Sequence, residues 1–199
     1  MYLDEILRKA VHVGSIVFPA AAVIFDRTDL VLALAAISLA LLLFDYLKAR
    51  NKAFKNLFLG VFGKMLRHRE EQGGMTASTI VVASAALTIL LFRTEIAVAA
   101  LVFLRLGGSA AALGGRPCGR IQLVAGRTLE GSLAALNVCL LAAIGLMALR
   151  PEMGWNLTPT ALLAGAVAAT LAELFELPLD DNLRIPLAAG LVMELLVPG

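Results

Sequence analysis

Seven long apolar segments follow one another along this chain, and they constrain its fold more than any single motif. Their approximate bounds are Ala10–Phe25, Leu30–Leu47, Ala77–Phe92, Ile96–Leu113, Leu133–Leu149, Pro159–Leu177 and Leu183–Val197. Because 60% of the 199 residues are hydrophobic and only 16% are charged, a soluble domain could not bury this much apolar surface. No segment alternates with the period of two that is typical of barrel strands. The sequence therefore predicts an all-α, polytopic membrane helix bundle with about seven transmembrane helices, forming one domain over residues 1–199.

The basic residues are distributed unevenly between the loops that join these segments. Thirteen of the 17 Lys and Arg residues lie in the N-terminal stretch and the even-numbered loops, whereas each odd-numbered loop holds one, namely Arg27, Arg93 and Arg150. The positive-inside rule then predicts a cytoplasmic N-terminus, cytoplasmic even-numbered loops and an external C-terminus. A net charge of +2 is too small to indicate nucleic acid as a partner. Cys118 and Cys139 lie at unrelated positions and indicate neither a disulfide nor a zinc site.

The second loop, residues 48–74, carries a pattern of its own. Apolar residues recur in it at helical spacing, while lysines and arginines occupy the other faces. This pattern predicts an amphipathic helix lying on the cytoplasmic membrane surface. Two roles remain open for it: an anchor on anionic lipid, or a direct role in binding a substrate.

Four polar clusters fall on the predicted cytoplasmic side: "RKAVHVG", "RHREEQGGMT", "LGGSAAALGGRPCGRIQLVAGRTLEGS" and "LPLDDNLRIPL". The third combines glycines with Arg116, Arg120 and Arg127. Glycine-rich backbone approaches an anion closely, and arginine forks match pairs of phosphate oxygens, so this cluster could bind phosphate. Its Glu130 could hold a Mg²⁺ ion that bridges phosphates. The alternative is a tight interhelical turn whose arginines set the topology.

The fourth cluster places two acids, Asp180 and Asp181, directly against an apolar segment. Such a pair needs a cation, a basic partner or water to compensate its charge. Arg184 could neutralise one of the acids. A divalent cation that arrives with a nucleotide is the interpretation favoured here, because Glu173 and Glu176 add acidic character one turn earlier.

Four of these stretches, "RKAVHVG", "GGSAAALGGRPCGR", "GRTLEGS" and "LPLDDNLRIPL", resemble in that order the motifs of the polyprenol kinase family. That family includes dolichol kinases, phytol kinases and CTP-dependent diacylglycerol kinases, and it is loosely related to phosphatidate cytidylyltransferases. The resemblance implies a membrane-embedded enzyme that transfers the γ-phosphate of a nucleotide, typically CTP, to a lipid alcohol. Its partners would be the lipid alcohol, the nucleotide and the bilayer, with Mg²⁺ as cofactor.

The resemblance also implies roles for individual residues. Catalytic roles would belong to Asp181, Glu130 and His12, and the metal ligands would be Asp180, Asp181 and Glu130. The residues that bind the nucleotide would be Arg8, Lys9, Gly115, Arg116, Gly119, Arg120, Arg127, Ser132 and Asn182.

The chain departs from the family pattern at Gly107–Gly108, where the family usually has Gly-Asp. Two alternatives therefore stay open beside the kinase. One is a lipid cytidylyltransferase, which would attack the α-phosphorus of the same nucleotide and release pyrophosphate. The other is a non-catalytic lipid-binding or transport protein, for which Asp45 and Arg105 are the ionisable candidates inside the apolar segments.

Overall fold

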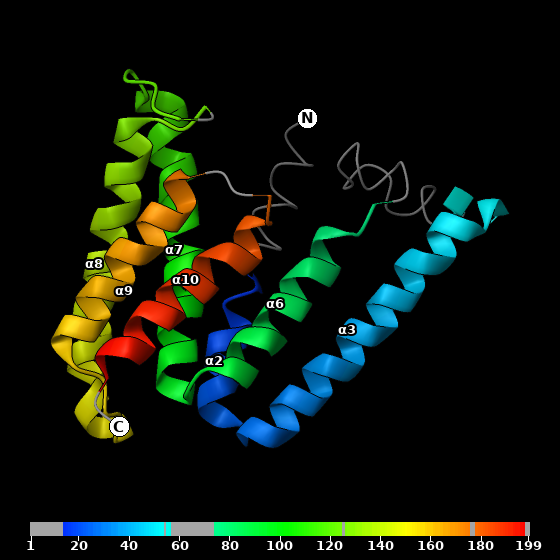
Figure 1. Cartoon of the computed structure of the whole chain (residues 1–199), viewed down its shortest axis with the longest axis horizontal. Coiled ribbons are helices and arrows are strands. Elements are labelled where there is room, and N and C mark those ends of the chain that lie inside the picture. The colour runs from blue at the N-terminus through cyan, green and yellow to red at the C-terminus, as the bar shows by residue number, and fades with distance from the viewer. Residues whose placement is uncertain (1–13, 54, 57–73, 125, 176–177, 198–199) are drawn as a thin grey trace.

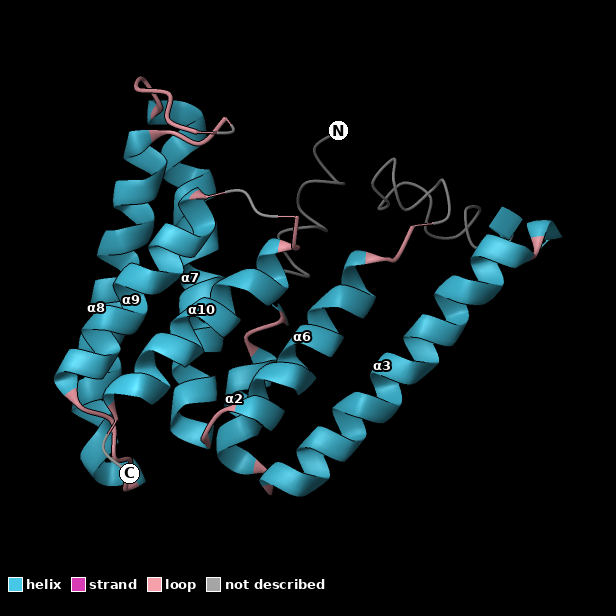
Figure 2. Ribbon diagram, viewed as in Figure 1, coloured by secondary structure: helices cyan, strands magenta, loops and turns pink. Residues whose placement is uncertain are grey.

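The computed structural model describes residues 14–53, 55–56, 74–124, 126–175 and 178–197. Helices and loops make up this part of the chain (Figure 2). Its seven helices are α2 (Val17–Ile24), α3 (Arg27–Arg50), α6 (Ala77–Leu91), α7 (Thr94–Cys118), α8 (Leu129–Met153), α9 (Pro159–Leu174) and α10 (Asp181–Leu196). Each of them falls on one of the seven apolar segments, so the predicted all-α bundle is confirmed. The amphipathic helix predicted for residues 48–74 lies largely outside the described residues.

Helix α7 is the centre of the bundle. It packs against α8, α10, α2 and α9, while α10 also packs between α9 and α6. Figure 1 shows α8 and α9 on one side of α7, α6 on the other, and α3 as the outermost helix beyond α6. The connections α2–α3, α6–α7 and α8–α9 lie at one end of the bundle. The loop that joins α7 to α8 lies at the other end, which is called here the hairpin end (Figure 1).

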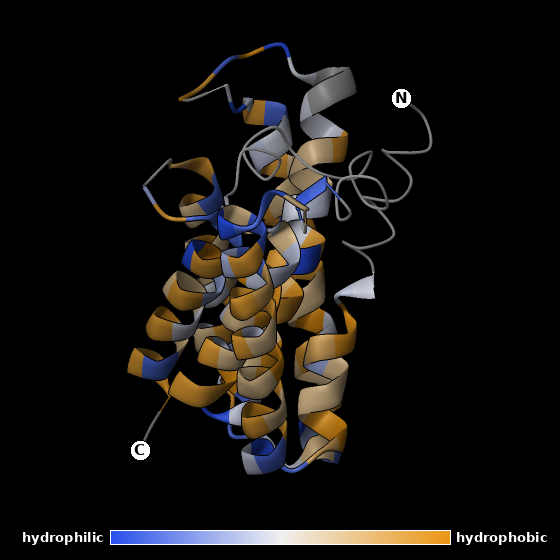
Figure 3. Ribbon diagram, turned by 90° about the vertical axis from the view of Figure 1, so that its right-hand side faces the viewer, coloured by the Kyte–Doolittle hydropathy of each residue, from blue (hydrophilic) through white to orange (hydrophobic). Residues whose placement is uncertain are grey.

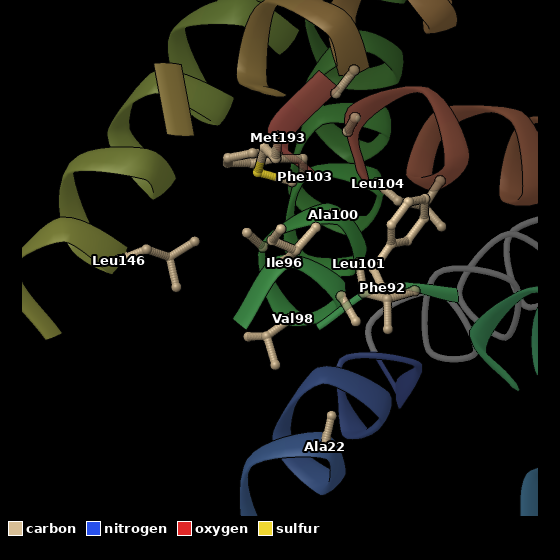
Figure 4. Close-up of a cluster of buried hydrophobic side chains, with 14 of the residues drawn as sticks. Ala22, Phe92, Ile96, Val98, Ala100, Leu101, Phe103, Leu104, Leu146 and Met193 are labelled. Carbon is tan, nitrogen blue, oxygen red and sulfur yellow. The ribbon is translucent and has the colours of Figure 1, made fainter. Parts of the chain in front are cut away.

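The core gathers around the first half of α7. The side chains of Ile96, Ala97, Ala100 and Phe103 are fully buried. Figure 4 shows Ile96, Ala100 and Phe103 among residues of α2, α8 and α10. The frequent alanines let neighbouring helix backbones approach closely, as is typical of helix packing in membranes.

The second half of α7 packs against α8 through glycines. A side chain at Gly131 would place its Cβ 2.9 Å from the carbonyl oxygen of Ala111, and one at Gly114 would lie 2.7 Å from Ala134 Cβ. Because no larger residue fits without a shift of the backbone, these glycines fix the close crossing of the two helices. The glycine-rich stretch therefore stays helical to Cys118, beyond the apolar segment that ends at Leu113.

Local signals in the sequence explain several helix ends. Thr158 caps α9 by accepting a hydrogen bond from Ala161 N at 3.1 Å, and Pro159 follows at the first helical position, as predicted. Asp26 caps α3 and accepts a hydrogen bond from Thr28 N at 2.8 Å. Gly154 ends α8 in the left-handed conformation, with φ of 65°.

Three of the described helices, α3, α7 and α8, are long and apolar enough to cross a membrane. The surface of the bundle is apolar as well, because large side chains such as Ile24, Leu39 and Leu195 are 69–77% exposed. Figure 3 shows hydrophobic residues along most of the length of the helices and hydrophilic residues mainly toward the two ends. This surface is compatible with a membrane protein.

Candidate functional site

Arg127 joins three separate elements near the hairpin end. It lies in the loop before α8, and its guanidinium forms an ion pair with Glu173 on α9, with Nη1 2.8 Å from Oε1. The same group pairs with Asp181 at the start of α10, with Nη2 2.9 Å from Oδ2. Glu173 is buried, so Arg127 compensates a carboxylate that water does not reach freely.

A second arginine compensates Asp181 from the other side. Arg184 lies one turn further along α10 and pairs with the Oδ1 atom of Asp181. The Asp181 side chain is 45% exposed, whereas that of Arg184 is 4% exposed. Arg184, which the sequence indicated as a possible partner, therefore does pair with Asp181, and Arg127 provides a second positive charge.

The neighbouring Asp180 has a different role, because it caps α10. Its Oδ1 atom accepts hydrogen bonds from Asn182 N at 2.9 Å and from Asn182 Nδ2 at 2.7 Å. The amide oxygen of Asn182 accepts a hydrogen bond from Arg105 Nη1 on α7 at 3.0 Å. The backbone carbonyl of Asn182 accepts another from Ser84 on α6. Asn182 thus links α10 to both α6 and α7.

These contacts define the Arg127 cluster, which consists of Arg105, Arg127, Glu173, Asp180, Asp181, Asn182 and Arg184. Some of its donors have no acceptor among the described residues: Arg105 Nε, Arg105 Nη2 and Arg127 Nε are buried without a hydrogen-bond partner. The same holds for the hydroxyl of Ser132 on α8. Buried guanidinium N–H groups are normally satisfied, so these groups have capacity for an anionic ligand.

Sequence analysis did not place Arg105 in this site, although it noted the residue as an ionisable group within an apolar segment. The position of a single arginine inside an apolar segment was the signal that could have indicated its role, because a buried charge in an apolar helix needs a partner or a function. Its partner, Asn182, lies 77 positions away in the sequence.

Glu130 occupies a different position, in the first turn of α8, beside the hairpin loop that joins α7 to α8. Both of its carboxylate oxygens lie 3.3 Å from Ile121 N, and Arg120 interacts with it electrostatically. Thr128 caps the same helix end by accepting a hydrogen bond from Gly131 N at 3.2 Å. Glu130 and Arg120 therefore hold the loop, and within the described residues neither forms an ion pair or hydrogen bond with the Arg127 cluster.

The predicted glycine cradle is largely explained by packing. Gly119 N donates a hydrogen bond to Gly115 O at 3.1 Å, which leaves that N–H unavailable to an anion. A Cβ at Gly115 would lie 2.9 Å from the Thr128 hydroxyl, so this glycine is needed for the close fit of the hairpin. Arg116 lies in the last turn of α7.

The predicted magnesium ligands do not form a metal site as they stand. Over the ranges that the structure describes, no three His, Cys, Asp or Glu side chains are grouped so that they could hold a metal ion. Asp180 is used as a cap, Asp181 is bound by two arginines, and Glu130 is engaged in the hairpin loop. Mg²⁺ prefers near-octahedral oxygen ligands, which this arrangement does not supply. Magnesium therefore stays a prediction of the family resemblance.

Three predicted residues of the N-terminal motif, Arg8, Lys9 and His12, lie outside the described residues, and so does Glu176. Gly108, where the family pattern expects an acid, lines a narrow hollow on the inner face of α7. Thr170 and Glu173 on α9 line the same hollow. A buried carboxylate is therefore present beside Gly108, although it comes from another helix.

A second group of buried polar side chains lies between α3 and α6. Asp45 Oδ1 accepts a hydrogen bond from Lys48 Nζ at 2.9 Å. Its Oδ2 accepts from Thr76 N at 2.9 Å and from Thr79 Oγ1 at 2.6 Å, and Lys48 Nζ also donates to Gly74 O at 3.0 Å. This Asp45 network, defined by Asp45, Lys48, Thr76 and Thr79, joins the two helices that flank the second loop.

Comparison with known proteins adds one relative. The chain is 26% identical to an uncharacterized protein of Rickettsia prowazekii (strain Madrid E) over 189 residues, which cover 91% of this chain and 89% of that protein. No protein-family model matches the chain, and no solved structure matches it. The similarity thus extends over nearly the whole length of both chains.

Proposed function

We propose that this chain is an integral membrane kinase that transfers the γ-phosphate of a nucleotide, CTP by the family resemblance, to the hydroxyl of a lipid alcohol. The observation that carries the proposal is the Arg127 cluster, which combines three arginines with three carboxylates and leaves guanidinium donors without acceptors. Arginine forks suit phosphate oxygens, and phosphoryl transfer depends mainly on positioned positive charge.

The membrane setting is part of the proposal. Three helices of sufficient length, an apolar surface and the uneven distribution of basic residues support about seven spans with the hairpin end in the cytoplasm. The sparse basic residues belong to the opposite end of the bundle, where Arg27 begins α3, Arg93 precedes α7 and Arg150 lies in the last turn of α8. The Arg127 cluster would then meet cytosolic nucleotide at its exposed side and lipid at its buried side.

The residues of the cluster suit the steps of such a transfer. Arg127 and Arg105 would hold phosphate oxygens with the N–H groups that have no acceptor. Asp181 is half-exposed and lies 2.9 Å from Arg127 Nη2, so its carboxylate could accept the proton of the lipid hydroxyl. The lipid oxygen forms a bond to the γ-phosphorus as the bond to the bridging oxygen breaks. The nucleoside diphosphate then leaves with the electron pair of the broken bond.

An isotope experiment tests this function against its alternatives. The purified chain is incubated with CTP labelled at either the α- or the γ-phosphorus, magnesium, and a panel of polyprenol, phytol and diacylglycerol. The proposal predicts γ-label in the lipid. Label from the α-phosphorus would instead show a cytidylyltransferase, and the absence of transfer to any lipid alcohol would contradict the kinase and favour a non-catalytic protein.

A further inference from the structure

The most unusual side chain of the bundle is Arg105 in the middle of α7. It is 3% exposed, and the structure gives it one hydrogen bond, from Nη1 to the amide oxygen of Asn182 at 3.0 Å. Within the described part of the chain it has no carboxylate at ion-pair distance, and its Nε and Nη2 atoms have no hydrogen-bond partner. A buried charge with two unmatched donors is unfavourable unless something else binds it.

The side chain of Asn182 separates Arg105 from Asp180. Asp180 acts on Arg105 electrostatically, but its Oδ1 atom is occupied by Asn182 N and Asn182 Nδ2. The amide of Asn182 therefore lies between the two charges, with its nitrogen toward the carboxylate and its oxygen toward the guanidinium. This arrangement leaves Nε and Nη2, on the other edge of the buried guanidinium, without an acceptor among the described residues.

The two unmatched atoms belong to the same edge. In a guanidinium group the Nε–H and one Nη2–H bond point in the same direction, which is the side-on geometry that binds two oxygens of a phosphate or carboxylate. Arg105 lies thirteen residues before the end of α7 at Cys118, or roughly 20 Å along the helix at 1.5 Å per residue. The edge formed by Nε and Nη2 therefore lies deep along α7, far from the hairpin loop.

We propose that Arg105 forms an oxyanion site inside the bundle, in which Nε and Nη2 bind two oxygens of a phosphate group. This deepens the proposed function and rests on it for the class of ligand, since the nucleotide substrate of a lipid-alcohol kinase brings phosphate to the site and the lipid product carries it after transfer. The shared chemistry is a phosphate monoester or a terminal phosphate. Its source is either water-soluble phosphate or the headgroup of a lipid.

Thermal unfolding of the purified chain in neutral detergent tests the site without any turnover. Inorganic phosphate is added at constant ionic strength, with chloride as the reference. At a phosphate concentration about five times the dissociation constant, the unfolding midpoint should rise by roughly 2–4 °C. In a second arm, micelles of phosphatidylcholine with or without phosphatidate replace free phosphate. A rise with free phosphate indicates a soluble source, and a rise with phosphatidate alone indicates a lipid source.

Variants assign the effect to Arg105. Arg105→Gln should abolish the rise, and Arg105→Lys should lose most of it because lysine has the charge without the fork. Arg93→Gln is the matched control, since it removes the same charge from the opposite end of α7 and should keep the full response. If Arg105→Gln does not fold, Asn182→Asp provides a second test, because a carboxylate that pairs with Nη1 neutralises the guanidinium and should abolish most of the rise.

The outcomes separate this proposal from the proposed function. A wild-type chain that responds to neither probe, or an Arg105→Gln chain that responds like wild type, would overturn the oxyanion site. A chain that shows the Arg105-dependent rise but transfers no γ-label to any lipid would contradict the kinase and leave the site standing.

Discussion

The Asp45 network and the Arg127 cluster are both groups of buried charges, yet they differ in how completely their polar atoms are used. Both carboxylate oxygens of Asp45 accept hydrogen bonds, and Lys48 has both a carboxylate and a backbone carbonyl as acceptors. In the Arg127 cluster, Arg105 and Arg127 bury three N–H groups without acceptors among the described residues. The first group is satisfied by the protein alone, whereas the second is not.

This difference separates a structural role from a binding role. A fully satisfied buried network fixes one packing of α3 against α6 and offers nothing to a ligand. Donors left without acceptors lower stability until a ligand with suitable acceptors binds, and active sites often retain such groups.

The largest loss of stability should follow Asp45→Ala. This substitution leaves the buried Lys48 without its carboxylate, and breaking a buried ion pair in this way costs about 3–5 kcal/mol. The free energy of unfolding in detergent, measured with a graded denaturant, would show the loss. The double variant Asp45→Leu/Lys48→Met removes both charges and should recover most of it, because no unpaired charge remains. An Asp45→Ala chain as stable as wild type would contradict the structural role.

A smaller loss of stability, with a large loss of activity, should follow Arg127→Gln. The variant leaves the buried Glu173 without its partner, which should cost about 1–3 kcal/mol. Transfer of γ-label should fall by roughly 10²–10³-fold, because a positioned cationic group is lost. Both quantities should be measured on one preparation. Undiminished transfer would remove Arg127 from the site, whatever the stability.

Asp181→Asn should affect activity almost exclusively. The side chain is 45% exposed, so its ion pair with Arg127 is screened and contributes less than about 1 kcal/mol to stability. Asparagine keeps an oxygen that can still accept a hydrogen bond from the buried Arg184. If Asp181 accepts the hydroxyl proton, transfer should fall by roughly 10²–10⁴-fold. Arg184→Ala is the companion variant, because it removes an ion pair of Asp181 but no proton acceptor. Equal loss of transfer in the two variants would indicate that Asp181 acts only through its pairing with Arg184.

Arg105→Met should have the smallest effect on stability. Unlike the substitutions above, it should raise the stability of the chain or leave it unchanged. Methionine removes a buried charge whose hydrogen bonds are incomplete, so the ligand-free chain should gain on the order of 1 kcal/mol or stay unchanged. Chemical unfolding without phosphate would measure this. A clear loss of stability would show that Arg105 supports the fold through Asn182 rather than serving a ligand.

The sequence predicted the helices better than the site, for a physical reason. Apolar periodicity is local, so all seven segments coincide with helices, and Thr158–Pro159 marked a helix start correctly. Helices α7 and α8 are longer than their apolar segments, because contacts such as Gly114 with Ala134 stabilise helix beyond the end of the apolar run. Such contacts depend on the tertiary packing and leave no local signal.

The site was predictable only in part. The acids beside an apolar segment indicated that Asp181 needs compensation, and Arg184, one turn away, was a visible partner. The pairing of Arg127 with Asp181 spans 54 positions and that of Arg105 with Asn182 spans 77, so both depend on how the helices are arranged. The role of Glu130 in holding the hairpin loop likewise depends on a turn that brings Ile121 beside it.

The most direct test compares the transfer of γ-label from CTP to a lipid alcohol among three chains. It asks whether the Arg127 cluster serves the reaction while the Asp45 network serves only the fold. The chains are wild type, Arg127→Gln, and the double variant Asp45→Leu/Lys48→Met. The account predicts transfer by wild type, comparable transfer by the double variant, and a loss of roughly 10²–10³-fold in Arg127→Gln. No transfer by wild type would contradict the account. So would equal transfer by wild type and Arg127→Gln, or a loss confined to the double variant.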